Sequence, residues 1–280
     1  MKELDSASGP VKECADSARK ISTRTESEPS RRLMFGPWDL ALVAVVSIMV
    51  TVMAYVRSPE WKAFVLLLPI PFTMAVMAVG KPVDATNAVG LVFLYVYMWS
   101  VRVLCYTLRL PILLAIAIAA CLYCGASALS LPLIPTTDRS FWISTAAVFA
   151  FAMAVAYGQS ARIEQGHKSP LPLWVKVPII VGVVCVLVLV KHRLQGFITT
   201  FPMVALVGAY EARKSLHTMI YHIPFIIIMV LSLMAVSKVA HESVGLGASL
   251  LLGWIVLMAE AIFLFQRTRR QSEERRGPTP

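Results

Sequence analysis

Charged residues are scarce in this sequence. Asp, Glu, Lys and Arg make up 15% of the 280 residues, against roughly 25% in soluble globular proteins. The hydrophobic class takes 58% and the mean hydropathy is +0.71. The apolar residues form long runs, which one water-soluble core of this size cannot hide. This composition excludes a soluble enzyme and predicts an integral membrane protein.

Catalytic and redox signatures are also missing. No Ser/His/Asp set, phosphate-binding glycine loop or nucleotide motif occurs at a usable spacing, and His241-Glu242 lacks the second His of a zinc-protease helix. The five cysteines do not form a disulfide framework, because four of them lie in apolar runs. Cys121 and Cys124 lie within one predicted helix and are expected to pack there. We therefore expect no enzyme, no cofactor and no metal site.

The formal net charge of +10 does not indicate a nucleic-acid partner. Lys and Arg concentrate in two polar tails and in short loops between apolar runs, as is typical beside membrane spans. The amino-terminal tail has no central apolar stretch, so it does not look like a signal peptide and is predicted to be disordered. The partner that this distribution indicates is the lipid bilayer.

Nine apolar runs are long enough to cross a hydrocarbon core of about 30 Å at 1.5 Å per residue. Short loops with Pro, Gly or charged residues separate them. Around the boundary between the third and fourth runs, Arg102 and Arg109 are the only charges, so one long tilted helix is the alternative there. The predicted spans are 38–57, 61–80, 87–106, 109–129, 141–158, 173–191, 195–211, 216–237 and 245–266.

An internal repeat is predicted in this all-α membrane fold. Residues 64–70 of the second span align with 197–203 of the seventh, and small residues and a charged loop follow each. This gives two four-helix repeats. Because a single linker helix lies between them, the second repeat starts from the opposite face of the membrane, and the two repeats are inverted. The predicted parts are a polar tail at 1–33, a first repeat at 34–129, a linker with the fifth helix at 130–172, a second repeat at 173–266 and a basic tail at 267–280.

The distribution of Lys and Arg between alternate loops specifies the membrane orientation only weakly. Without the amino-terminal tail, the basic residues favour a cytoplasmic carboxyl terminus and an external amino terminus. Inclusion of that tail nearly balances the two sides. A weak bias is typical of two fused antiparallel repeats, and a miscounted helix is the alternative explanation.

Residues 196–210 carry Phe201-Pro202, then Ala205-Leu206 and Tyr210. This pattern resembles the characteristic helix of the GlpM-type family, which consists of small bacterial inner-membrane proteins. The similarity continues loosely through residues 217–225. The resemblance implies a multi-pass protein of a bacterial inner membrane.

The first half of the chain is similar to the same family at two places. Residues 68–71 (Leu-Pro-Ile-Pro) resemble its proline helix, and residues 109–111 (Arg-Leu-Pro) resemble the entry to its last helix. Members of the family are half as long as this chain, so the resemblance implies a tandem duplication over 38–129 and 173–266. It also implies a link to exopolysaccharide production of the alginate type. The fifth helix and the two tails depart from the family pattern.

Glu260 is the only acid well inside a predicted span. An isolated charge near the centre of a membrane helix costs roughly 2.5–3.5 kcal/mol on insertion scales, so something must offset it. One interpretation is a substrate or proton site, because burial favours the proton-carrying form of a carboxyl group. The alternative is a carboxylate that reaches the interface or pairs with an Arg.

Pro69, Pro71 and Pro202 remove backbone donors within the predicted second and seventh spans. Broken helices at matching places in two repeats are typical of a central binding site in transporters. The alternative is a packing kink whose freed groups are satisfied by neighbouring helices or threonines. The threonines in question are Thr73, Thr199 and Thr200.

His222 and Arg102 complete the candidate substrate-binding residues. His222 in the eighth span can relay protons, and a ring hydrogen-bonded within the bundle is the alternative. Arg102 can pair with Glu260 or bind an anionic headgroup, while its place near a span end also suits a side chain that reaches the interface. His217 lies on another face of the same helix, so a metal pair is not expected.

Two functions remain open. The first is a transporter or flippase of a small molecule, lipid or envelope precursor, with its site where the two proline helices meet. The second is a non-transporting scaffold or accessory subunit of an envelope-polysaccharide system. A cavity shared by the proline helices and Glu260 favours the first function, and scattered or lipid-facing positions favour the second.

Overall fold

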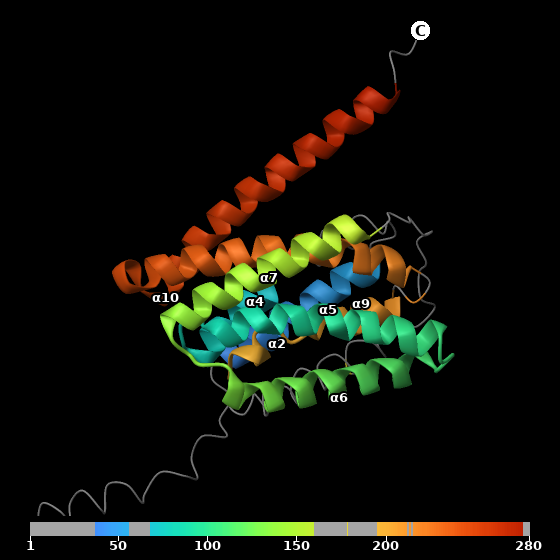
Figure 1. Cartoon of the computed structure of the whole chain (residues 1–280), viewed down its shortest axis with the longest axis horizontal. Coiled ribbons are helices and arrows are strands. Elements are labelled where there is room, and N and C mark those ends of the chain that lie inside the picture. Colours follow the sequence, from blue (N-terminus) through green and yellow to red (C-terminus); the bar gives the residue numbers. More distant parts are fainter. Residues whose placement is uncertain are drawn as a thin grey trace, which may run out of the picture. The chain divides into compact units, whose positions relative to one another are not determined.

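A computed structural model describes residues 37–55, 68–159, 178, 195–211, 213 and 215–276. All of them belong to the unit Gly36–Pro280. Every regular element in these ranges is helical, in the order α2 (Pro37–Tyr55), α4, α5, α6, η1 (Leu131–Leu133), α7, η2, α9 and α10 (Figure 1). Of the predicted sixth span only residue 178 is described, and the predicted tail at 1–33 lies outside the described residues.

Within the described ranges, four helices are long and apolar enough to cross a membrane. They are Ala85–Tyr106 (α5), Ile112–Leu133 (α6 with the short η1), Asp138–Gly158 (α7) and Leu216–Phe263 (the apolar part of α10). They fit an integral membrane protein. The count of nine spans, the repeats and the linker helix stay predictions.

Local capping explains where α5 and α7 begin. The side chain of Asp84 accepts a backbone N–H of the first turn of α5, and Asn87 Oδ1 accepts the Asp84 N–H at 2.7 Å in a capping box. Thr137 caps α7 by accepting a backbone N–H in the same manner. The two helices therefore begin at Ala85 and Asp138, slightly before the predicted apolar runs.

The chain breaks between α5 and α6, so the alternative of one long tilted helix is wrong. Arg109 takes a left-handed backbone conformation with φ 53°. The Leu110 N–H then donates to Leu104 O at 3.0 Å, which closes the turn. Pro111 precedes α6 (Ile112–Ser130), and its ring prevents continuation of a helix through this point.

α10 (Leu216–Arg276) contains a break at Gly245, whose φ of 79° and ψ of 171° favour glycine. We call residues 216–244 the first arm and residues 246–276 the second arm. The apolar part of α10 has 48 residues. That is about 72 Å at 1.5 Å per residue, or more than two crossings of a hydrocarbon core of about 30 Å. The predicted eighth and ninth spans correspond to the two arms, and the predicted loop shrinks to one glycine.

The predicted seventh span, 195–211, is not one helix. It consists of the 3-10 helix η2 (Gln195–Ile198), a turn, and α9 (Met203–Glu211). Pro202 separates them, because a proline disfavours a helical conformation in the residue before it. This proline therefore begins a short helix and does not kink a long one.

The described part of the second predicted span is also a short helix, α4 (Ile70–Val79). Pro69 is its N-cap and Pro71 lies in its first turn, where the missing N–H leaves no helical hydrogen bond unmade. Gly80 ends the helix with a φ of 67°, and its N–H donates to Val76 O. Residues 61–67 of this predicted span lie outside the described residues.

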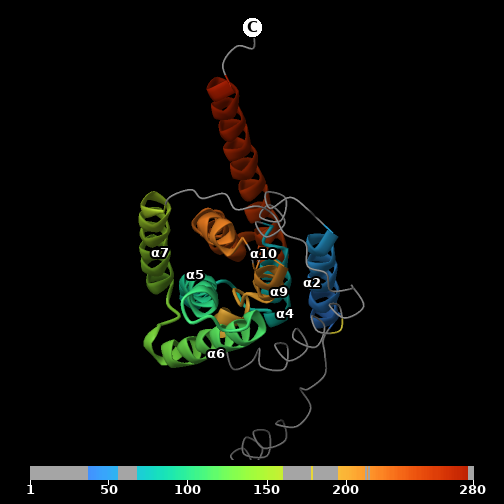
Figure 2. The same cartoon turned by 90° about the vertical axis from the view of Figure 1, so that its right-hand side faces the viewer.

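α5 is the central helix of the bundle. It packs against α6, α7, α9, η2 and α10, and Figure 2 shows α2, α6 and α7 around a centre of α4, α5, α9 and the first arm. We compared an apolar stretch of 18 residues in each helix. Of these residues, 61% are buried in α10, against 22% in α6 and 17% in α7. α6 and α7 therefore turn most of their surface outward.

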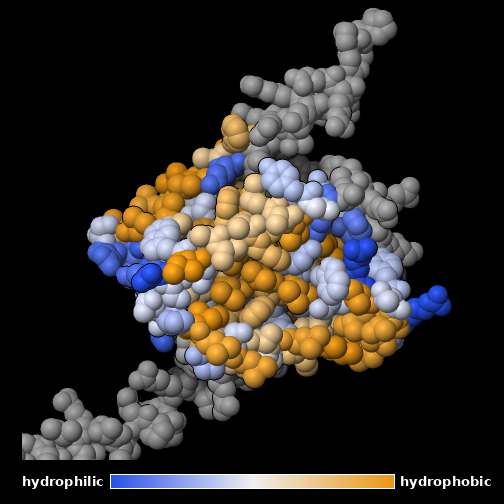
Figure 3. Space-filling view, in the orientation of Figure 1, coloured by the Kyte–Doolittle hydropathy of each residue, from blue (hydrophilic) through white to orange (hydrophobic). Residues whose placement is uncertain are grey.

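Apolar side chains occupy much of the face of the molecule that Figure 3 shows. Exposed large apolar residues include Leu122 and Leu129 on α6, Ile143 and Phe149 on α7, and Ile255 on the second arm. Soluble monomers rarely expose large contiguous apolar patches. In a membrane such a surface contacts lipid tails, so the free-energy cost of exposing it to water does not arise.

Candidate functional site

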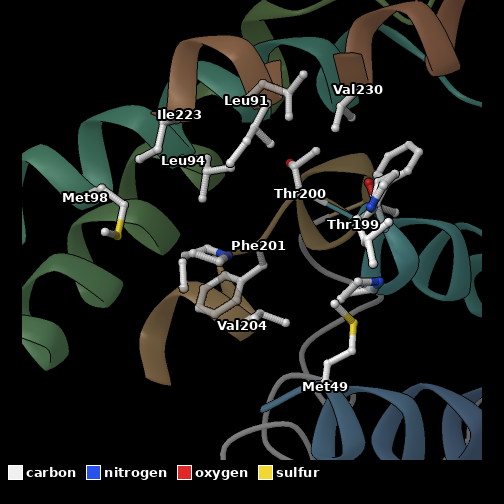
Figure 4. Close-up of a pocket in the computed structure, with 17 residues that line it drawn as sticks. Met49, Leu91, Leu94, Met98, Thr199, Thr200, Phe201, Val204, Ile223 and Val230 are labelled. Carbon is white, nitrogen blue, oxygen red and sulfur yellow. The ribbon is translucent and has the colours of Figure 1, made fainter. Parts of the chain in front are cut away.

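A cavity of about 90 Å³ lies among α4, α5, α9 and the first arm of α10. Figure 4 shows Leu91 and Leu94 of α5 and Val230 of the first arm on one side, with Phe201 and Val204 on the other. Apart from the hydroxyl groups of two threonines in the turn before α9, the described side chains that line it are apolar. Segments far apart in the sequence therefore enclose one site.

The three prolines predicted as site residues all line this cavity. Pro69 and Pro71 approach from the start of α4, and Pro202 approaches from the start of α9. Their fixed φ and missing N–H allow each helix to begin at the cavity without an unpaired donor at these positions. Thr73 Oγ1 donates to Ile70 O at 2.9 Å, so this hydroxyl is satisfied within α4 itself.

Asn87 and Thr199 join α5 to the turn before α9. The Thr199 hydroxyl donates to Gly196 O at 2.7 Å and accepts a hydrogen bond from Asn87 Nδ2 at 2.6 Å. Asn87 Nδ2 also donates to Gly196 O at 3.1 Å. Asn87 is 3% exposed, so neither water nor lipid competes for these bonds and they fix one wall of the cavity.

Asn87 was missed by the sequence analysis, although it is the only asparagine among the 280 residues. Its Oδ1 serves the capping box with Asp84 while its Nδ2 holds the turn. The spacing of Asp84 and Asn87 at a helix start is a local signal that indicates the cap. Its partners in the turn lie 109 and 112 residues further along the chain, and no local pattern predicts them.

Tyr123 of α6 supports the same turn from the other side. Its hydroxyl donates to Phe197 O at 2.9 Å and lies 3.1 Å from Thr200 Oγ1. Its ring makes edge contacts with Phe201 at 5.1 Å and Phe93 at 6.2 Å between centroids. The turn that carries both threonines is therefore held by α5 and α6 together.

Two glycines allow the close approach of this turn to α5. A Cβ on Gly90 would overlap Thr200 Oγ1, and a Cβ on Gly196 would overlap Thr86 Oγ1. Side chains at these positions would move the turn out of its place. The wall of the cavity therefore depends on two positions where only hydrogen fits.

The other three predicted site residues lie outside the lining. Glu260 is half-buried on the second arm, and its Oε2 accepts a hydrogen bond from Ser232 Oγ at 2.7 Å. Arg102 is half-buried on α5 and, among the described residues, forms no ion pair with Glu260. The ring of His222 contacts the ring of Tyr221 at 5.4 Å between centroids. The structure thus brings the prolines together and leaves the titratable residues elsewhere.

Among the described residues, no charged side chain lines the cavity, and no three His, Cys, Asp or Glu side chains lie where they could hold a metal ion. The cavity volume of about 90 Å³ holds several waters or a few heavy atoms, and it is below the roughly 300–1,000 Å³ of sites for drug-sized ligands. The site suits a small uncharged solute.

Comparisons of the chain with protein-family models, with curated proteins and with solved structures found no match. The predicted duplication of a GlpM-type unit stays a prediction. The functional argument therefore rests on the geometry of the cavity and of the helices that form it.

Proposed function

We propose that this protein is a membrane transporter for a small uncharged solute, which binds in the cavity between α4 and α9. The observation that carries the proposal is the meeting of Pro69, Pro71 and Pro202, at the starts of two short helices, in one cavity. α4 has 10 residues and α9 has 9. These are about 15 Å and 14 Å at 1.5 Å per residue, or half of a hydrocarbon core of about 30 Å. Discontinuous helices of this kind are typical of midplane transporter sites.

The charge and size of the cavity favour a small neutral solute over a lipid or an envelope precursor. A charged headgroup would lose its hydration and meet no counter-ion among the described side chains that line the cavity. A lipid also exceeds the volume of the cavity. Transport of a small molecule is therefore preferred to a flippase.

The inverted repeat belongs to the same proposal. α4 lies in the predicted first repeat and α9 in the second, and each begins at a proline beside the cavity. A tandem duplication of a GlpM-type unit, in a bacterial inner membrane, accounts for this correspondence. Movement of α4 against the turn before α9 would open the cavity to alternate sides.

The test is solute entry into proteoliposomes. Vesicles with the full chain are mixed with urea or glycerol, and stopped-flow light scattering reports re-swelling against protein-free vesicles. We expect faster entry of at least one solute. Ala205 lines the cavity and is buried, so Ala205→Phe should abolish the increase, whereas the exposed Ala154 on α7 provides the control Ala154→Phe.

Equal entry rates with and without protein would overturn transport and favour the scaffold alternative. Equal rates for the Ala205→Phe and Ala154→Phe variants would place the path outside this cavity. Ala205→Val, which adds less volume, serves where the larger side chain prevents folding, and size-exclusion chromatography in detergent shows which variants remain folded.

A further inference from the structure

Two threonines carry the only hydroxyl groups among the described side chains that line the cavity. They are Thr199 and Thr200 in the turn before α9, and they are 5% and 6% exposed. Figure 4 shows Thr200 between Leu91 of α5 and Phe201. Since the other described lining side chains are apolar, the state of these two hydroxyls decides which polar groups of a solute the cavity can receive.

The hydrogen of the Thr199 hydroxyl is used within the protein. Its Oγ1 donates to Gly196 O at 2.7 Å and accepts a hydrogen bond from Asn87 Nδ2 at 2.6 Å. A hydroxyl group has one hydrogen and two lone pairs, so Thr199 keeps one lone pair and no hydrogen for a solute. Rotation of the hydrogen toward the cavity would break a buried hydrogen bond, at a cost in free energy.

The hydrogen of the Thr200 hydroxyl is also used within the protein. Its Oγ1 lies 3.2 Å from Phe197 O and 3.1 Å from the Tyr123 hydroxyl. Tyr123 donates to Phe197 O at 2.9 Å, so the Thr200 hydrogen serves either this carbonyl or the Tyr123 oxygen. In both cases the lone pairs of Thr200 Oγ1 are what this side chain offers to a solute.

The remaining polarisable atoms of the described side-chain lining are acceptors as well. Met49 and Met98 contribute thioether sulfurs, which accept hydrogen bonds weakly and donate none. The three lining prolines, Pro69, Pro71 and Pro202, have no backbone N–H. The described side chains therefore offer a solute hydrogen-bond acceptors, and each proline removes a backbone donor beside the cavity.

We infer that the solute of this cavity is a small neutral hydrogen-bond donor of the urea type, whose N–H or O–H groups donate to Thr199 and Thr200. No covalent bond forms or breaks. A solute without such groups would leave the buried lone pairs unpaired when it binds, and this lowers its affinity. The two threonines thus determine specificity, and the apolar lining limits size. The solute class rests on the proposed transport function, because it concerns the same cavity.

The test compares urea with dimethyl sulfoxide, which has the same number of non-hydrogen atoms but no N–H or O–H. Stopped-flow light scattering measures the entry of each into proteoliposomes of the full chain and into protein-free vesicles. We expect the protein to raise urea entry at least about tenfold more than dimethyl sulfoxide entry, because a site that pairs with a solute N–H discriminates against an analogue without it.

The two possible failures are distinguishable. Equal increases for urea and dimethyl sulfoxide would leave transport standing and overturn the assignment of a hydrogen-bond donor. No increase for either solute, nor for glycerol, would overturn transport and the solute class with it.

Thr200→Val tests the specificity of the cavity directly, because valine keeps the shape of threonine and removes the hydroxyl. We expect the ratio of urea entry to dimethyl sulfoxide entry to fall about three- to tenfold, whereas Thr200→Ser keeps the hydroxyl and should keep the ratio. Thr145→Val on α7, outside the lining, is the matched control.

An unchanged ratio in Thr200→Val, or an equal fall in Thr145→Val, would overturn the role of the Thr200 hydroxyl. Size-exclusion chromatography in detergent shows which variants remain folded. If Thr200→Val does not fold, the comparison of the two solutes with the unaltered chain still decides the solute class.

Discussion

The two walls of the cavity are built differently. The α9 wall, residues 196–202, is fixed by side chains from two other helices, since Asn87 and Tyr123 hydrogen-bond its hydroxyl and carbonyl groups. The α4 wall is formed by Leu68, two prolines and Phe72, and its hydroxyl at Thr73 bonds only within its own helix. One proline-led helix is therefore held by buried polar contacts, and the other by apolar packing.

This difference indicates which wall can move. Apolar contacts are non-directional, so α4 can slide against α2 and the first arm at a small cost. Buried hydrogen bonds must be broken before the α9 turn can move, and each unsatisfied partner adds a penalty. We expect the cavity to open by movement on the α4 side while the α9 turn stays on α5. Variants of the two walls test this asymmetry.

The largest effect is expected for Asn87→Ala. It removes both bonds to the turn and the acceptor of the capping box, so we expect a loss of about 2–3 kcal/mol in the free energy of unfolding. Thermal unfolding in detergent measures it. Gln159→Ala is the matched control, because this amide donates to Tyr95 OH outside the cavity. Similar losses in both variants would remove the special role of the α9 wall.

Gly90→Ala should have the next largest effect. The new methyl group overlaps Thr200 Oγ1, and overpacking of this kind costs about 1–3 kcal/mol. Gly125 of α6 has open space around it, so Gly125→Ala should leave stability unchanged or raise it by up to about 1 kcal/mol. The double variant Gly90→Ala/Thr200→Ala should regain part of the loss. No recovery in the double variant would show that the clash lies elsewhere.

A smaller effect is expected for Tyr123→Phe. The variant keeps the ring contacts and loses the hydrogen bond to Phe197 O, at a cost of about 1 kcal/mol. The hydroxyl of Tyr157 is on an 83% exposed side chain, so Tyr157→Phe is the control and should not change the unfolding temperature. Equal behaviour of the two variants would mean that α6 does not hold the turn.

The smallest effect is expected on the α4 wall. Thr73→Val removes a hydroxyl that bonds only to carbonyl groups of its own first turn, and we expect a change within about 0.5 kcal/mol. Thr199→Val, which breaks the contact with Asn87, should cost more in the same unfolding assay. If the two valine variants lose the same stability, the comparison between the walls fails.

Local signals in the sequence were enough to predict much of the helical framework. The apolar runs at 87–106 and 141–158 correspond to α5 and α7, and Gly245 lies at the predicted start of the last span. Capping boxes, prolines and apolar periodicity act within a few residues, so they can be read along the chain. For Pro202 the sequence left a broken helix and a packing kink open, and in the structure this proline lies before α9 and not within a helix.

The contacts that shape the site could not be predicted in this way. The bonds from Asn87 to the turn join residues more than 100 positions apart, and an apolar helix can pair with any other apolar helix in a membrane. The sequence offered Arg102 as a partner of Glu260, whereas in the structure Ser232 Oγ donates a hydrogen bond to Glu260 Oε2. A serine inside an apolar run gives no signal that distinguishes it from one that bonds only to its own helix.

The most direct test of the account is whether the starts of α4 and α9 border the same cavity. Phe72 and Val204 line it from the two helices, so Phe72→Cys/Val204→Cys on a cysteine-free background should be joined by a short bismaleimide cross-linker, as detected by mass spectrometry of linked peptides. Phe72→Cys paired with Phe149→Cys, at an exposed position on α7, is the control and should remain unlinked. Linkage of the first pair alone is the predicted result, and absence of linkage, or equal linkage in both pairs, would contradict a cavity shared by the two proline-led helices.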